Sequence, residues 1–117
     1  MDNSTRGDLV SSSDVNGTEV YGRDGSNVGS INHLMIDKQS GKVAYAVMGF
    51  GGFLGMGEDY QPVPWSKLQY DSSKNGFVTD ITEQDVKGAP ERNNNWYTDR
   101  DWEQRTHDHY GARNYWL

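Results

Sequence analysis

Apolar and polar residues alternate along the middle of the chain with the two-residue period that is typical of β-strands. In the segment 42–50 both parities are apolar: Val43, Tyr45 and Val47 on one, and Ala44, Ala46, Met48 and Phe50 on the other. A strand that is apolar on both faces is typical of a position inside a fold. We therefore expect this strand to be covered on both sides.

Shorter segments with strand-like alternation surround this one and are separated by turn residues. The expected strands are 18–21, 28–37, 58–63, 68–70 and 77–79. Within 28–37 the parity of the apolar residues changes near Asn32 and His33, which predicts a β-bulge. Pro62 cannot donate a hydrogen bond within a ladder, so its strand is expected at an edge.

A helix is predicted over residues 99–110, after a linker over residues 88–95. Thr98 is the expected N-cap, and Gly111 stands where the helix should stop. One face at helical spacing contains Trp102, Thr106, His109 and Tyr110. A single helical turn is also expected over residues 82–86.

Five or six short strands followed by a helix predict an all-β fold, namely a small six-stranded antiparallel β-barrel with a C-terminal helical extension. We expect a flexible N-terminal lead-in over residues 1–16 and the barrel over residues 17–87. A linker and an aromatic-rich C-terminal helix and tail would occupy residues 88–117.

Composition narrows the function classes. The 117 residues carry a net charge of −6 and no segment is basic, which disfavours binding to nucleic acid or to an anionic membrane. The absence of cysteine excludes disulfides and thiolate chemistry. No apolar run approaches the about 20 residues of a membrane span, and the N-terminus lacks the apolar core of a secretory signal. The expected location is the cytoplasm.

Aromatic residues gather in the C-terminal tail. Six of the fourteen lie within residues 91–117, namely Trp96, Tyr97, Trp102, Tyr110, Tyr115 and Trp116. They could pack the helix on its own barrel, or they could dock on a partner, since Trp and Tyr are enriched at interfaces. Together with Phe53 of the glycine-rich turn, they form the candidate protein interface. The second alternative predicts a homodimer, with tails that could be exchanged.

No catalytic, cofactor-binding or metal-binding residue is predicted. The glycines of residues 49–57 lack the lysine and hydroxyl residues of a phosphate-binding loop. His107 and His109 are two residues apart on a helix and point to nearly opposite sides, so they should not share an ion. His33 is expected to be structural. The acids Asp99, Asp101 and Glu103 are expected to be solvated or to favour the helix start.

Four segments together resemble the PRC-barrel family, named for the cytoplasmic domain of the photosynthetic reaction centre H subunit. They are VYGRDGSNVGSI (20–31), IDKQSGKVAYAV (36–47), GGFLGMG (51–57) and PVPWSKL (62–68). The ending DWEQRTHDHYGARNYW (101–116) is similar to the aromatic extension of small stand-alone bacterial members. The resemblance implies a six-stranded β-barrel that serves in interaction or assembly and has no shared catalytic residues. We expect neither a membrane helix like that of the H subunit nor a second domain like that of the ribosome-maturation factor of this family, so neither specific role is expected to transfer.

The sequence therefore predicts a non-enzymatic protein-interaction or assembly module without cofactor, which binds an unknown protein partner and self-associates as a homodimer. One alternative is a small-ligand or metal-binding domain with a pocket lined by His33 or His109. Another, by family analogy, is a ribosome- or RNA-associated factor, which the negative charge disfavours.

Overall fold

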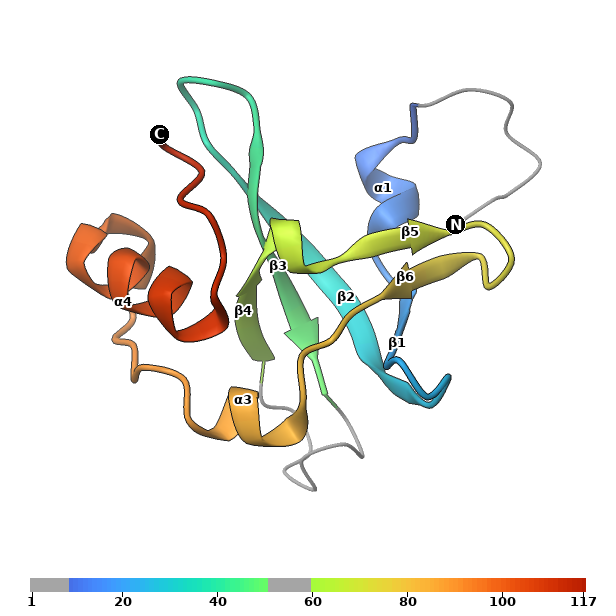
Figure 1. Ribbon diagram of the computed structural model, residues 1–117. Coiled ribbons are helices and arrows are strands. Elements are labelled where there is room, and N and C mark those ends of the chain that lie inside the picture. Colours follow the sequence, from blue (N-terminus) through green and yellow to red (C-terminus); the bar gives the residue numbers. More distant parts are fainter. Residues whose placement is uncertain (1–8, 51–59) are drawn as a thin grey trace.

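Figure 1 shows the computed structural model of the chain, which describes residues 9–50 and 60–117. Six strands form one sheet in the order β4-β3-β2-β1-β6-β5. The strands are β1 (Glu19–Tyr21), β2 (Asn27–Ile36), β3 (Val43–Gly49), β4 (Tyr60–Pro64), β5 (Gln69–Asp71) and β6 (Gly76–Val78). The helices are α1 (Ser12–Val15), α3 (Glu83–Lys87) and α4 (Arg100–Tyr110), with short 3₁₀ turns η1 (Trp65–Lys67) and η2 (Trp96–Thr98).

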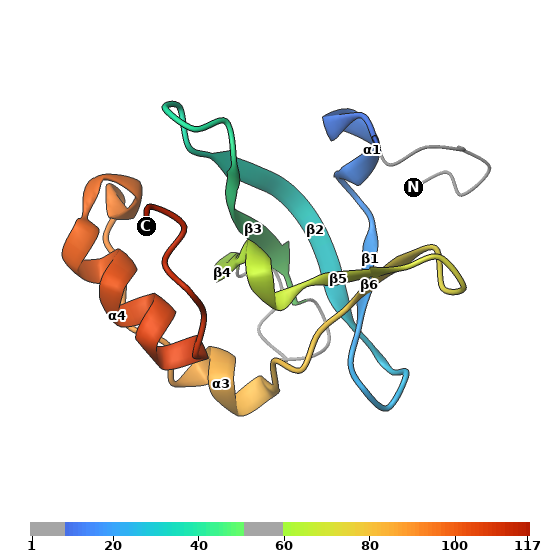
Figure 2. The same cartoon turned by 45° about the horizontal axis from the view of Figure 1, so that its top comes forward.

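The sheet is mixed, which corrects the prediction of an antiparallel barrel. β1 and β6 run parallel, with Val20 opposite Phe77, whereas the other pairings among the described residues are antiparallel. The order begins with β4 and ends with β5, so the described strands do not close into a ring. The reason is long-range: the β5–β6 hairpin returns across the β2–β3 pair and places β6 beside β1 (Figures 1 and 2). A mostly-sheet fold with a C-terminal helix is confirmed.

The predicted bulge in the long strand β2 is present. Ile31 lies opposite Met48 and His33 opposite Val47, so the register of β2 against β3 shifts at Asn32. Ile31 is 1 % exposed, whereas Asn32 and His33 are exposed. The bulge therefore lets the side chain of Ile31 stay in the main core while it changes the direction in which the side chains after it point.

Both faces of β3 are covered, as its sequence predicts. All residues from 44 to 48 are buried. Ala46 and Met48 belong to the main core between the strands, whereas Tyr45 packs with Trp102 of α4 in a second, smaller cluster. The C-terminal segment thus supplies the cover for the outer face of β3 (Figure 1).

The end of the N-terminal segment, from residue 11 to residue 17, packs against the sheet. Ser11 caps the helical turn α1, and Val15 is 4 % exposed within the main core. The amide of Gly17 donates to the carbonyl of Ile31 on β2 at 2.6 Å. One apolar side chain and one backbone hydrogen bond fix this end of the chain to the sheet.

The helix α4 begins one residue later than expected. Its N-cap is Asp99, whose carboxylate accepts a hydrogen bond from the Trp102 amide at 3.1 Å, so the assignment of the cap to Thr98 is wrong. Gly111 ends the helix in the left-handed conformation, with φ of 66°. None of the described helices is long and apolar enough to cross a bilayer.

Candidate functional site

The C-terminal segment builds an aromatic cluster over the outer face of β3, with Tyr45 at its centre. The Tyr45 ring centroid lies 5.4–5.8 Å from those of four rings, namely Trp96, Trp102, His107 and Tyr115. The Trp102 indole N–H donates to the carbonyl of Pro90 at 3.3 Å, which satisfies its polar atom. The cluster therefore attaches the segment 96–116 to the sheet.

Two of the predicted interface residues are buried within the chain itself. Trp102 is 3 % exposed and Tyr110 is 7 % exposed, so both pack on the sheet of their own chain. Trp96, Tyr115 and Trp116 are half-buried, whereas Tyr97 is 54 % exposed. Phe53 lies outside the described residues. Among the tail aromatics, Tyr97 presents the most free surface.

Glu103 lies under the aromatic cluster, and its burial corrects the expectation of a solvated or capping side chain. It is 4 % exposed, and its Oε1 accepts hydrogen bonds from the hydroxyls of Tyr45, at 2.9 Å, and Tyr115. Its Oε2 lies 3.5 Å from Nε of Arg100. A buried carboxylate needs such partners, and here they come from a strand, a helix and the tail.

The two tyrosine hydroxyls are held in their protonated form. Burial, together with the adjacent negative charge of Glu103, raises the pKa of Tyr45 far above its ordinary value. Burial and the hydrogen bond to Glu103 raise the pKa of Tyr115 in the same way. Both hydroxyls therefore remain hydrogen-bond donors throughout the physiological range.

Beside the cluster lies a recess of about 60 Å³ between the end of β2 and the tail, which we call the aromatic recess. Its lining comprises four aromatic side chains, two carboxylates and three apolar residues: Tyr45, Trp96, Tyr97, Tyr115, Glu103, Asp37, Met35, Ile36 and Ala44. Among the described residues that line the recess, none is a lysine or an arginine. The hydroxyl of Ser40 donates to Asp37 at 2.6 Å and lowers the pKa of that carboxyl, so Asp37 is ionised at neutral pH.

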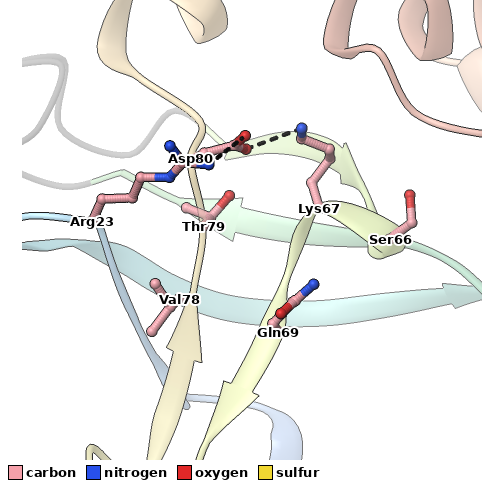
Figure 3. A pocket seen from close by; sticks show the side chains of 7 residues that line it. All are labelled: Arg23, Ser66, Lys67, Gln69, Val78, Thr79 and Asp80. Carbon is pink, nitrogen blue, oxygen red and sulfur yellow. Dashed lines mark hydrogen bonds and ion pairs between the residues drawn. The ribbon is translucent and has the colours of Figure 1, made fainter.

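A second hollow lies near the other end of the sheet and is polar (Figure 3). Arg23 and Lys67 approach one carboxylate, that of Asp80, at 3.5 and 3.0 Å. The hydrogen bond from Lys67 lowers the pKa of Asp80. This polar pocket has a volume of about 230 Å³ and is also lined by Ser66, Gln69, Val78 and Thr79.

Comparison with models of known protein families shows to which family the chain belongs. The model of the PRC-barrel domain matches residues 7–86, more than half of the 117 residues. The chain belongs to the PRC-barrel family. No curated protein matches the sequence. The PRC-barrel match includes all six strands but ends before α4, so the aromatic recess is shared between the family domain and the C-terminal segment that follows it.

The histidines of this PRC-barrel protein point to separate partners. His107 is 1 % exposed, with Nδ1 2.7 Å from the Glu103 carbonyl, whereas His109 is exposed, with Nε2 2.7 Å from the Asp85 carbonyl. The predicted apolar helix face is therefore wrong in placing His109 inward: His107 takes that position. Within the part of the chain that the structure describes, no three His, Asp or Glu side chains are placed to hold a metal ion.

Sequence reasoning missed the residues that matter most in both hollows. Glu103 is separated from its partner Tyr45 by 58 positions, and Arg23 from Asp80 by 57. No local pattern connects residues so far apart. A weak sign was available for Glu103, because it lies next to the buried Trp102 and one turn before His107 on the same helix.

Proposed function

We propose that this PRC-barrel protein is a non-catalytic protein-interaction module that self-associates and docks through the surface around the aromatic recess. One observation carries the proposal. Ile36 and Tyr97 are each 54 % exposed, and they lie together at the rim of a recess whose floor is fixed by buried hydrogen bonds. Exposed apolar side chains beside a rigid hollow are typical of interaction surfaces.

The groups around the recess support binding in preference to chemistry. The Glu103 carboxylate is engaged by two tyrosine hydroxyls and Arg100, and both hydroxyls have raised pKa values. A general acid or base needs a pKa near the working pH and a proton that is free to move. These residues are instead committed to holding the tail on β3.

Self-association is the interaction that can be tested most directly. A domain of this size buries only about 60–65 % of its unfolded surface, so pairing of two copies adds useful burial. We expect sedimentation velocity between 1 and 100 µM, a range in which weak dimers of about micromolar Kd are detected, to show a concentration-dependent dimer. The double variant Ile36→Ser/Tyr97→Ser should shift the equilibrium towards the monomer.

A matched control is Tyr70→Ser, which removes a tyrosine that is 41 % exposed elsewhere on the sheet. It should leave the dimer unchanged. If the wild-type chain stays monomeric over the whole range, and if it retains the same proteins from a native lysate as the double variant does, the proposed function is refuted.

The polar pocket favours a second candidate function, the binding of a small anion. Two cationic side chains share the single carboxylate of Asp80, so donor groups of Lys67 and Arg23 are left over at the pocket. Titration calorimetry with inorganic phosphate should then give a saturable signal that Lys67→Gln abolishes and Lys87→Gln retains. Equal signals in both variants would exclude this candidate.

A further inference from the structure

The walls of the aromatic recess are built from rings that meet nearly at right angles. Tyr45 and Trp96 are inclined at 86° with centroids 5.6 Å apart, Tyr45 and Tyr115 at 80°, and Trp96 and Tyr97 at 85°. Tyr45 is 2 % exposed and enclosed by its neighbours, so the rings that can offer a π face to the hollow are the half-buried Trp96 and Tyr115 and the exposed Tyr97. Such faces carry partial negative charge and attract cations.

The charged groups of the lining have the same sign. Glu103 and Asp37 are both carboxylates, and the nearest balancing cation, Arg100, is not among the lining residues. Its guanidinium lies over the Trp116 ring, 3.8 Å from the centroid, and 5.6 Å from the ring centroid of Tyr115, which lines the recess. Its Nε is 3.5 Å from Glu103. The single charge of Arg100 pairs with Glu103 and also favours the ionised form of Asp37. One cation thus offsets two carboxylates only in part, which leaves the lining with a net negative charge.

We propose that the aromatic recess binds the ammonium group of a lysine side chain from a partner polypeptide. The inference rests on the proposed function and names the chemistry that the same surface recognises. A volume of about 60 Å³ admits an ammonium head but not a whole side chain. The methylene stem of the lysine would then lie along the exposed apolar side chain of Ile36, as long cationic side chains commonly do.

Other occupants fit this lining less well. An anion would be repelled by the two carboxylates of Glu103 and Asp37, whose charge the single guanidinium of Arg100 offsets only in part. A neutral alkyl group would contact the rings but would gain nothing from the two carboxylates. The positive charge is therefore the property that a test must isolate.

The first experiment compares two probes with the same number of heavy atoms, butylammonium chloride and butan-1-ol. Nuclear magnetic resonance would follow the indole N–H of Trp96 and the backbone amide of Tyr97 at constant ionic strength. We expect saturable shifts with butylammonium, with a Kd of about 1–10 mM for so small a ligand, and at least about fivefold weaker binding of the alcohol. Equal affinity of the two probes would overturn the inference.

Variants then locate the binding. Tyr97→Leu keeps an apolar side chain but removes one π face, so it should weaken butylammonium binding about two- to fivefold. Tyr97→Phe should retain the wild-type affinity, and Asp37→Asn should weaken binding without affecting the rings. Tyr70→Leu is the matched control and should change nothing. Unchanged affinity in both Tyr97→Leu and Asp37→Asn would show that the ammonium binds elsewhere and would refute the assignment.

A final pair of probes tests lysine as the source of the ammonium. The blocked peptide Ac-Ala-Lys-Ala-NH2 should shift the same resonances, and the peptide with Nε-acetyllysine should not. If butylammonium and the lysine peptide bind but the chain neither dimerises nor retains a partner, the proposed function fails and the ammonium site stands. If the protein associates through Ile36 and Tyr97 while neither ammonium probe binds, this inference alone fails.

Discussion

At the scale of single residues, two buried tyrosine hydroxyls should affect stability in opposite ways. The hydroxyl of Tyr45 donates to a buried carboxylate, whereas that of Tyr110 is buried and has no hydrogen-bond partner among the described residues. Burying a hydroxyl costs desolvation free energy, and a hydrogen bond within the protein offsets that cost. A buried hydroxyl without a partner therefore destabilises the fold, whereas a paired one does not. The structure therefore predicts that removing each hydroxyl will change stability in a different direction.

Tyr45→Phe should lower the free energy of unfolding by about 1–2 kcal/mol, because Glu103 loses one of its donors. Tyr110→Phe should leave it unchanged or raise it by up to about 1 kcal/mol. Urea denaturation of both variants under identical conditions provides the comparison. Equal losses would show that Tyr110 has a partner in solution.

Glu103→Ala tests the centre of the network. It should lower the free energy of unfolding by about 2–4 kcal/mol, because two buried hydroxyls lose their acceptor and a cavity forms. The control Glu83→Ala removes a glutamate whose side chain is 41 % exposed and pairs with Lys87, and it should change stability by less than about 0.5 kcal/mol. Similar small losses in both variants would mean that the carboxylate does not hold the tail.

At the scale of elements, the helix α4 shows how a local motif fixes the position of a distant surface. Its N-cap determines where the first turn begins and therefore which residues face β3. Asp99→Ala should lower the free energy of unfolding by about 1 kcal/mol, because the Trp102 amide loses its acceptor. Thr98→Ala should have a smaller effect. If thermal denaturation shows a larger loss of stability for Thr98→Ala than for Asp99→Ala, Thr98 is the N-cap, as the sequence alone suggested.

Local sequence patterns predicted the strands and the helix better than they predicted which of these elements contact one another. The alternation over 42–50 indicated the two-sided burial of β3, and the change of parity near Asn32 indicated the bulge. The parallel pairing of β1 with β6 could not be read in this way, because it depends on a contact between Val20 and Phe77. The burial of Glu103 depends on Tyr115, which lies beyond the end of the helix. The periodicity of the helix therefore could not predict it.

At the scale of the whole molecule, burial of tyrosines links stability to alkaline pH. The pKa of Tyr110 is raised from 10.0 to about 12 by burial, and Tyr45 and Tyr115 shift in the same direction. Below about pH 10 these groups are protonated in both the folded and the unfolded chain. Above it the unfolded chain loses its protons first, so stability should fall as the pH rises.

The expected measurement is a flat free energy of unfolding between about pH 8 and 9.5, followed by a steady decline towards pH 12. Tyr110→Phe should reduce the slope of that decline, because it removes a buried tyrosine whose pKa is raised in the folded chain. A decline of the same slope in both proteins would show that other groups cause the loss of stability at alkaline pH.

The parallel contact between β1 and β6 has a consequence for the nascent chain. β1 leaves the ribosome more than fifty residues before β6, since Val20 pairs with Phe77. Until then β2 is the one partner of β1 among the strands that the structure describes, and the other edge of β1 offers backbone groups to any neighbouring polypeptide. Closing so long a loop is also slow compared with forming a hairpin. Early synthesis is therefore the stage at which this protein is most exposed to pairing with the wrong chain.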